Sequence, residues 1–336
     1  MKIFITGVAG FLGRHLAENF IKQSHRVSGC DDLSGGDLEN IPDKTDFYNL
    51  DCKDFNKIRD IIDKIKPDTV FHCAATPHEG FSIFSPSHIT KNIFESSVSV
   101  FSASISSKVK KIVFCSSMAR YGNQKAPFSE NMIPLPVDPY GIAKVASEDV
   151  LKVLGEVHKI KYTIAVPHNI VGPFQKYDDP YRNVMSIMLN RMLQNKPPII
   201  YGDGEQTRCF SYIDDCISCL EKMAYSNNTD GEIINIGPDE GGVTINQLAD
   251  LCSNEIGFNG SPIYYKPGRP QEVKHATCSS EKARKILNYK TIYSLEESIK
   301  KTADYIRLKG TKDFSYYLDI ELNNEKTPET WTKKQF

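Results

Sequence analysis

The sequence lacks the features that would place it in a membrane or on a nucleic acid. No run of apolar residues reaches the roughly 18–20 needed to cross a bilayer as a helix. Lys and Arg total 41 against 42 Asp and Glu, so there is no basic surface for nucleic acid or anionic lipid. The apolar start, Met1 to Thr6, is too short for a signal peptide. We expect a cytoplasmic protein without nucleic-acid or membrane partners.

Cysteine shows no pattern of pairing. There are nine, an odd number, without the spacing of a disulfide framework or a zinc site. Cys216 and Cys219 form a single CxxC, and no second Cys or His pair stands at finger-like spacing. We favour two thiols on a buried helix face over metal or redox chemistry, and we assign no metal.

The 336 residues are enough for about two domains. In the first half, short β-branched runs alternate with amphipathic helical patterns, which predicts βαβ units in a parallel sheet with helices on both faces. The expected strands are Lys2–Thr6, Arg26–Asp31, Asp46–Asn49, Thr69–Ala74, Lys111–Ser116 and Tyr162–Val166, and the expected helices are Leu12–Gln23, Asn56–Lys64, Ile89–Ser107 and one from Asp138.

The second half has fewer strands and more loops, with one helix expected at Val184–Gln194 and a loop at Pro267–Pro270. We therefore predict an α/β protein, a Rossmann-type doubly wound parallel sheet with a smaller α/β substrate-binding domain. The sheet domain would span residues 1–168, rejoined by about 210–237. The smaller domain would span 169–209 and 238–320, followed by a tail at 321–336.

A glycine turn follows the first strand. Gly7, Gly10 and Gly13 stand between that strand and a helix, where glycine lets the backbone approach a pyrophosphate and the helix N-terminus offers free N–H groups. Asp31 ends the next strand, 18 residues after Gly13, where a carboxylate binds the adenosine ribose; Asp32 follows it. No arginine lies beside them, which favours NAD over NADP.

Two further patterns concern Asp51 and a tyrosine. Asp51 follows the third strand and is an adenine-amine ligand or, equally, a helix-capping or loop carboxylate. Asp138-Pro139-Tyr140 opens a helix, and Lys144 lies one turn after Tyr140 on the same face. A neighbouring ammonium favours the phenolate, as a general base for a sugar hydroxyl requires, and Ser117 at a strand end could orient that hydroxyl.

With these motifs the chain resembles the extended short-chain dehydrogenase/reductases that act on nucleotide sugars, typified by UDP-glucose 4-epimerase. The resemblance runs from residue 1 to about 305. It rests on TGVAGFLG at 6–13, DDLSGG at 31–36, HCAA at 72–75, SSMARYG at 116–122, PYGIAK at 139–144, HNIVGP at 168–173, YGDGEQTRCFSYIDD at 201–215, NIG at 235–237 and GRP at 268–270.

The resemblance implies a catalytic trio of Ser117, Tyr140 and Lys144, with Lys144 also on the nicotinamide ribose. It implies further NAD contacts at Phe11, Leu12, Ala74, Ala75, Asn92 and Pro167. For the nucleotide-sugar diphosphate it implies Asn169, Arg208 and Arg269, and guanidinium groups suit phosphate oxygens. The alternative for either arginine is an ion pair with a carboxylate such as Asp214. The remaining substrate candidates are His78, Met118, Arg182, Asn183 and Tyr201; His78 and His168 also fit purely structural roles.

The same resemblance bears on the reaction. Met118 and Ala119 replace the proton-exchanging residues of related 4,6-dehydratases, 3,5-epimerases and fucose synthases. The catalytic trio that remains suits a 4-epimerase acting on a UDP-hexose or a UDP-uronate. In such an enzyme, NAD takes the C4 hydride and returns it to the other face of a 4-keto sugar. The alternatives are a nucleotide-sugar dehydrogenase or 4-ketoreductase, a dehydratase, and a non-catalytic NAD-binding regulator.

Two expectations concern single features. Arg120 replaces an apolar residue of the relatives, and we favour an ion pair with a surface carboxylate over a contact with a substrate carboxylate. Relatives pair as homodimers through helices that match Ile89–Ser107 and Asp138–Leu154. Burial of those apolar faces within one monomer is equally compatible with the sequence.

Overall fold

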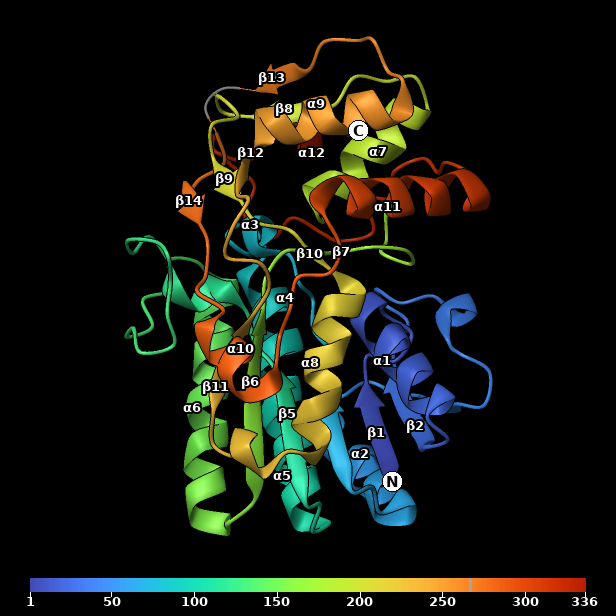
Figure 1. Ribbon diagram of the computed structural model, residues 1–336, viewed down its shortest axis with the longest axis vertical. Coiled ribbons are helices and arrows are strands. Elements are labelled where there is room, and N and C mark those ends of the chain that lie inside the picture. Colours follow the sequence, from blue (N-terminus) through green and yellow to red (C-terminus); the bar gives the residue numbers. More distant parts are fainter. Residues whose placement is uncertain (266–267) are drawn as a thin grey trace.

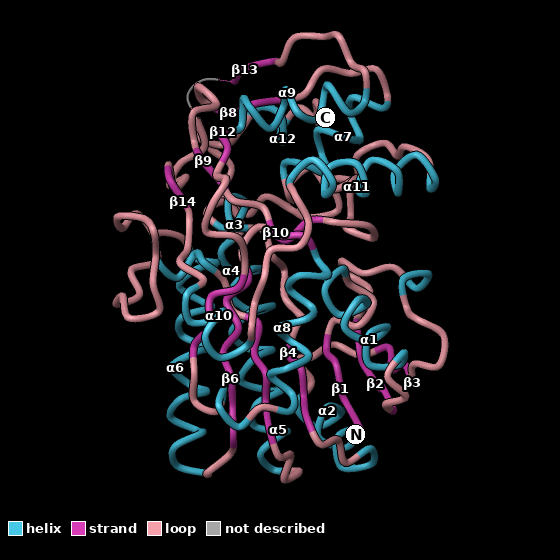
Figure 2. The backbone as a smooth tube through the Cα atoms, viewed as in Figure 1, coloured by secondary structure: helices cyan, strands magenta, loops and turns pink. Residues whose placement is uncertain are grey.

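The computed structural model describes residues 1–265 and 268–336, and its centre is one parallel sheet (Figures 1 and 2). Seven strands lie in the order β11-β6-β5-β4-β1-β2-β3, all parallel. They are β1 (Lys2–Thr6), β2 (Arg26–Asp31), β3 (Asp46–Asn49), β4 (Thr69–His72), β5 (Lys111–Cys115), β6 (Lys161–Pro167) and β11 (Ile233–Ile236). The predicted Rossmann-type doubly wound α/β fold is confirmed.

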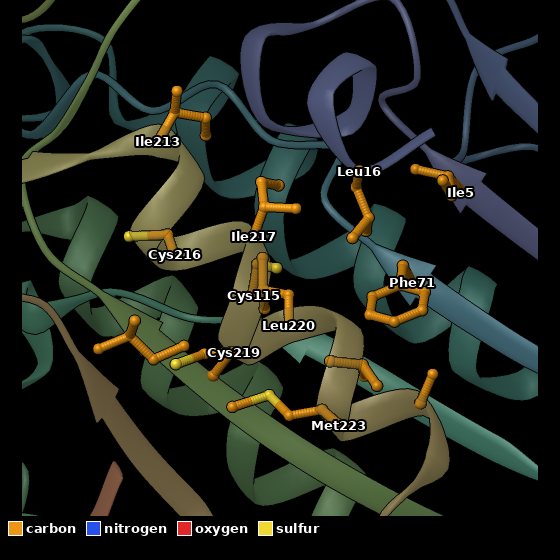
Figure 3. Packing of buried hydrophobic residues seen from close by; sticks show 14 of the residues in the cluster. Ile5, Leu16, Phe71, Cys115, Ile213, Cys216, Ile217, Cys219, Leu220 and Met223 are labelled. Carbon is orange, nitrogen blue, oxygen red and sulfur yellow. The ribbon is translucent and has the colours of Figure 1, made fainter. Parts of the chain in front are cut away.

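Helices cover both faces of this sheet. One face carries α1 (Phe11–Lys22), α8 (Ile213–Tyr225) and α10 (Glu281–Leu287), and the other carries α2 (Phe55–Ile65), α5 (Ser96–Ser106) and α6 (Pro139–His158). Figure 3 shows α8 packed on the sheet, with Cys216 and Cys219 pointing into the apolar layer. Both thiols are fully buried, so the interpretation of this CxxC as a core feature is confirmed.

A second group of elements lies above the sheet in Figure 1. It has its own apolar cluster, formed mainly by α7 (Val184–Leu193), α9 (Ile245–Ile256) and α11 (Leu295–Lys309). Three small sheets, β10-β7, β12-β9-β14 and β13-β8, accompany it. Their strands are β7 (Ile170–Val171), β8 (Ile199–Tyr201), β9 (Thr207–Arg208), β10 (Ser211–Tyr212), β12 (Val243–Thr244), β13 (Ile263–Tyr265) and β14 (His275–Ala276). This cluster supports the proposed smaller domain, whose boundaries stay a prediction. The loop expected at Pro267–Pro270 begins outside the described residues.

The predicted helix Ile89–Ser107 is divided. It consists of α4 (Pro86–Thr90), one π-helical turn at Lys91–Glu95 and α5, preceded by α3 (Glu79–Ser82). Elsewhere, the predicted strands Lys2–Thr6, Arg26–Asp31 and Asp46–Asn49 have the observed bounds, and the other predicted elements agree to within two residues, except that α6 continues to His158. None of the helices in the described part of the chain combines the length and apolar character that crossing a bilayer requires.

The tail is packed against the body of the protein. Its short helix α12 (Glu329–Thr332) carries Trp331, the single tryptophan, which is 2% exposed. The Trp331 ring contacts the rings of Phe81 and Phe84, in and just after α3, and those of Tyr181 and Tyr201. The tail therefore packs against both the α3 segment and the second group of elements.

Candidate active site

A cavity of about 450 Å³ is lined by residues that follow the sheet strands β1, β2, β4 and β5 and by residues of the second group of elements. Ligand crevices of doubly wound folds lie at the carboxyl ends of such strands. Each catalytic, cofactor-binding and substrate-binding residue proposed from the sequence lines this cavity. His168 does not: it is fully buried, and its Nε2 lies 3.2 Å from the Pro238 carbonyl oxygen.

One end of the cavity is the glycine turn. Gly7 has φ +72°, and a Cβ on Gly13 would lie 2.1 Å from the Gly7 carbonyl oxygen, so both positions require glycine. Helix α1 begins at Phe11 with no side-chain cap and no acidic residue in its first turn. Its first N–H groups have no partner within the helix and face the cavity, which fits the pyrophosphate of a dinucleotide.

Asp31 stands beside this turn. Its carboxylate accepts hydrogen bonds from the Ala9 N–H (3.1 Å) and the Leu33 N–H (2.8 Å), and it is 8% exposed. Burial raises the pKa of Asp31, opposed by these backbone donors. The side chain is thus fixed at the cavity wall with a free lone pair for a ribose hydroxyl, which fits NAD.

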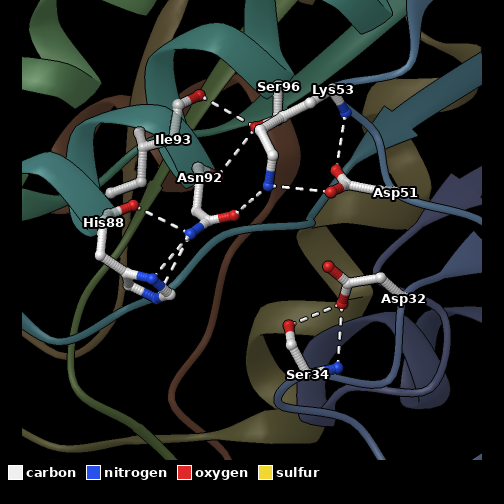
Figure 4. A network of polar contacts seen from close by, with 8 residues as sticks. All are labelled: Asp32, Ser34, Asp51, Lys53, His88, Asn92, Ile93 and Ser96. Carbon is white, nitrogen blue, oxygen red and sulfur yellow. Dashed lines mark hydrogen bonds and ion pairs between the residues drawn. The ribbon is translucent and has the colours of Figure 1, made fainter. Parts of the chain in front are cut away.

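A polar network borders the same end (Figure 4). Lys53 Nζ lies 2.9 Å from Asp51 Oδ2 and donates to Asn92 Oδ1 at 2.6 Å. The Asp51 carboxylate also accepts from the Lys53 N–H. Asp32 accepts from the backbone and hydroxyl of Ser34. Asp51 therefore has the loop role that was one of its two interpretations, and it still faces the cavity.

The proposed catalytic trio meets at the ends of β5 and the start of α6. Asp138 caps α6 by accepting from the Gly141 N–H at 2.8 Å, which confirms the predicted helix start and fixes Tyr140 in the first turn. Ser117 is close enough to Tyr140 that its hydrogen bond lowers the phenol pKa. Lys144 donates from Nζ to the Cys115 carbonyl oxygen at 2.7 Å.

The electrostatics of the trio are dominated by burial. Burial raises the pKa of Tyr140, and the carboxylates of Glu79 and Asp138 raise it further against the Ser117 hydrogen bond. Burial also lowers the pKa of Lys144 to about 8. In the protein alone, therefore, the Lys144 ammonium is held by Cys115 and the phenol stays protonated.

The opposite end of the cavity is basic. Arg269 Nη2 lies 2.6 Å from Glu272 Oε1, and Arg208 Nη2 lies 3.7 Å from the same oxygen. Asp214 was therefore the wrong carboxylate to expect, because β9 and the loop after 268 turn both guanidinium groups toward Glu272. The two guanidinium groups share one carboxylate, so a net positive charge remains at this end, which suits a diphosphate.

The other substrate candidates are held by neighbours. His78 Nε2 lies 2.8 Å from Asp179 Oδ2, with both side chains buried. Asn169 donates to the Cys209 carbonyl oxygen, and Asn183 caps α7 through the Met185 N–H. Tyr201 shares a hydrogen bond with the tail residue Thr330, and Arg182 lies in electrostatic range of Asp179 and Tyr140.

Arg120 differs from expectation. It is 1% exposed and forms a bidentate pair with Glu148, which is fully buried on α6. Glu148 also accepts from the Ser116 hydroxyl, so the pair lies behind the strand end that carries Ser117. The predicted surface carboxylate is wrong, because Arg120 lies on the inner side of the short 3₁₀ turn Met118–Tyr121.

Several cavity residues were not found from the sequence. Glu79, Glu272, Tyr317, Leu318 and Phe336 all line it. The tail residues had one available signal, a concentration of aromatic residues in a segment without periodicity. Glu79 had none, since its position depends on how the loop after β4 folds. In the described residues, no three His, Cys, Asp or Glu side chains gather as a metal site.

Comparison with known proteins agrees with this geometry. The model of the NAD dependent epimerase/dehydratase family matches residues 3–237. A UDP-glucose 4-epimerase of Mycolicibacterium smegmatis is 29% identical, covering 92% of this chain and 100% of its own. The crystal structure of a UDP-glucose 4-epimerase from Thermotoga maritima with UDP-glucose is 34% identical, with a TM-score of 0.86 over 92% of this chain and 99% of that one.

A third similar protein was solved with both ligands. It is the UDP-glucuronic acid 4-epimerase of Bacillus cereus in complex with UDP-glucuronic acid and NAD, 27% identical, with a TM-score of 0.83 over 92% of this chain and 100% of that one. The glycine turn, the Asp31 carboxylate and the family match point to one cofactor. The chain belongs to the NAD-dependent epimerase/dehydratase family, with NAD as its cofactor.

Proposed function

We propose that this chain is an NAD-dependent 4-epimerase of a nucleoside diphosphate sugar, with uridine diphosphate as the carrier. The observation that carries the proposal is one continuous cavity with a dinucleotide turn at one end, two arginines at the other and Tyr140 between them. The similar proteins that act on UDP-glucose and UDP-glucuronic acid support the choice of UDP.

The cofactor would be held by residues of the sheet unit. Gly7, Gly10 and the first turn of α1 would hold the pyrophosphate, Asp31 the adenosine ribose, and Lys144 the nicotinamide ribose. When bound, NAD supplies a hydride acceptor and a positive ring charge beside Tyr140. Such a charge opposes the burial that keeps the pKa of Tyr140 high, so the phenolate becomes accessible once the site is assembled.

The side chains then have separate tasks at the sugar. Tyr140 takes the proton of the C4 hydroxyl and returns one to the epimeric oxygen, while Ser117 orients that hydroxyl. Arg208 and Arg269 hold the diphosphate, so the sugar ring can turn over without leaving the cavity. Met118 and Ala119 exchange no proton, which leaves elimination at C5 and C6 without an acid or base at these positions.

The test is product analysis. Purified protein, without added NAD, is incubated with UDP-glucose, UDP-N-acetylglucosamine and UDP-glucuronate, and the products are identified by NMR. We expect a C4 epimer from at least one of them, with no net absorbance change at 340 nm. A dehydrated or reduced product without any C4 epimer would contradict the proposal, and so would turnover that consumes added cofactor.

A homodimer is part of the proposal. Helix α6 carries an exposed apolar stripe of Ile142, Val153 and Val157, and α5 packs beside it. Two such faces joined by a two-fold axis would bury the stripe. Light scattering of the wild type should give a dimer mass, and Val153→Glu should shift it toward the monomer. A monomeric wild type would contradict this part.

A cytoplasmic location is also proposed. Cys73 and Cys115 have sulfurs 3.7 Å apart, and Cys30 and Cys52 have sulfurs 3.8 Å apart, yet all are free thiols. Thiol pairs this close suit a reducing compartment. Localisation of a tagged chain by fractionation tests this, and recovery outside the cytoplasm would contradict it.

A further inference from the structure

Glu79 is a carboxylate in the cavity that neither the sequence motifs nor the mechanism above uses. It is the first residue of α3 and is open to the cavity. Its charge raises the pKa of Tyr140, while Arg208 and Arg269 act on Glu79 itself. Glu79 is therefore within electrostatic range of both the phenol and the diphosphate arginines, which places it on the stretch where the sugar would lie.

The neighbouring backbone keeps Glu79 close to the arginine end. The residue after it is Gly80, and a Cβ there would lie 3.3 Å from Arg269 Nη1. A larger side chain at position 80 would push that guanidinium away. The glycine thus lets α3 and Arg269 approach each other, with Glu79 beside the contact.

Among the described residues, the Glu79 carboxylate has no hydrogen-bond or ion-pair partner. The Ser82 hydroxyl donates to the Glu79 carbonyl oxygen. Arg269 and Arg208 pair with Glu272 instead. The protein atoms around the cavity and the nearby Asp138 raise the pKa of Glu79 to about 7, although its side chain is exposed to the cavity, so the carboxylate is fully charged above this pH. Because the side chain is exposed to the cavity and has no partner there, its carboxylate is available to accept hydrogen bonds from a ligand.

The surrounding charges decide which ligand groups fit there. Arg208 and Arg269, with their partner Glu272, would hold the diphosphate, whereas Glu79 and Asp138 are the carboxylates that act on Tyr140, where the sugar would lie. Arg182 is a further cation in electrostatic range of Tyr140. A sugar carboxylate at this place would meet Glu79 as a like charge, whereas hydroxyl, amide or ammonium groups would donate to it.

We propose that Glu79 is a specificity-determining residue that accepts hydrogen bonds from an uncharged or amino-bearing sugar and selects against uronates. The inference rests on the proposed function in one respect, that a nucleotide sugar occupies this cavity. It narrows the substrate class to UDP-hexoses and UDP-hexosamines and removes UDP-uronates.

The test measures binding separately from turnover. In the Tyr140→Phe protein loaded with NAD, calorimetry gives the affinities for UDP-glucose, UDP-N-acetylglucosamine and UDP-glucuronate. Each is divided by the affinity for UDP, so that effects on the diphosphate cancel. Glu79→Gln, which keeps the shape and removes the charge, is then added in the same background. Glu296→Gln, on the exposed first turn of α11, is the matched control.

We expect UDP-glucuronate to bind at least tenfold more weakly than the better uncharged sugar, and Glu79→Gln to reduce this ratio to about threefold or less. The control should leave the ratio unchanged. Equal or tighter binding of UDP-glucuronate in the protein that retains Glu79 would overturn the inference. A ratio that Glu79→Gln does not move would overturn it as well.

Failure of the proposed function gives a different result. In that case the wild-type enzyme forms no C4 epimer, whatever the binding ratio in the Tyr140→Phe background. If epimers form but Glu79→Gln does not change the ratio between the affinities for the uncharged sugar and for UDP-glucuronate, the proposed function stands and the role of Glu79 is rejected. A melting temperature of the Glu79→Gln protein within 2–3 °C of its parent would show that folding does not account for the change.

Discussion

Arg120 and Glu148 form an ion pair in the interior, with Arg120 Nη2 3.1 Å from Glu148 Oε2 and side-chain exposures of 1% and 0%. The pair connects the turn after β5 to the middle of α6, the two elements that carry Ser117 and Tyr140. Arg120 also packs over the ring of Tyr121. The ion pair therefore joins the two elements that carry the proposed catalytic groups.

Replacing one partner of this pair should destabilise the protein strongly. Arg120→Met leaves Glu148 buried without its main cation, and breaking such pairs typically costs about 3–5 kcal/mol. Urea unfolding measures the loss. The double replacement Arg120→Met with Glu148→Leu should recover much of it, because no charge is then left buried. A double variant as unstable as the sum of both single variants would contradict this account.

The glycine turn gives a prediction for cofactor retention. Gly13→Ala places a methyl group 2.1 Å from the Gly7 carbonyl oxygen, so the turn must open. We expect NAD to bind at least tenfold more weakly, measured by the cofactor released on denaturation and by titration of the stripped protein. Gly242→Ala is the control, since its nearest contact would be an ordinary 3.4 Å to Cys209 Sγ. Normal NAD content in Gly13→Ala would count against the proposed cofactor site.

Acid should destabilise the protein through buried histidines. Burial lowers the pKa of His72 from 6.5 to about 3, and its ring nitrogens contact Thr6 Oγ1 and Ser97 Oγ. Between these values the unfolded chain binds a proton that the folded chain does not. The free energy of unfolding therefore falls as pH drops from about 6.5 toward 3, by up to about 1.4 kcal/mol per pH unit for this group.

The measurement is urea unfolding at several pH values from 7 to 4. His78 and His168 are also buried with lowered pKa values and add to the wild-type slope. His72→Gln should reduce the slope of the unfolding free energy against pH by the equivalent of about one bound proton, while the other histidines keep their contributions. An unchanged slope in that variant would mean that His72 is not held neutral in the folded protein.

The tail offers a spectroscopic prediction. Trp331 is the single tryptophan and packs against the rings of Tyr181 and Tyr201, both of which line the cavity. Its emission should be that of a buried indole and should change when UDP is titrated into the NAD-bound protein. Trp331→Ala should raise KM for the nucleotide sugar more than it changes NAD content. If UDP leaves the emission unchanged, UDP binding does not alter the surroundings of Trp331, which would contradict this prediction.

How well the sequence predicts each part of this site depends on how far apart the interacting residues lie along the chain. The glycine turn, the Asp138 cap and the Tyr140–Lys144 spacing are local, and the sequence alone predicted where they lie. Arg120, Arg208 and Arg269 were recognised, but their partners Glu148 and Glu272 depend on packing between distant elements, and the expected surface partner of Arg120 was wrong. Glu79 and the tail contacts of Trp331 are also non-local, and no short motif marks them.

The most direct test of the central claim follows the hydrogen at C4. UDP-glucose deuterated at C4 is incubated with the enzyme without added NAD, and the C4 epimer is analysed by NMR and mass spectrometry. The account predicts that the product keeps its deuterium at C4 and that Tyr140→Phe slows its formation by about 10²–10⁴-fold. Exchange of the label with solvent, or an unimpaired Tyr140→Phe enzyme, would contradict reversible oxidation at C4 with Tyr140 as the base.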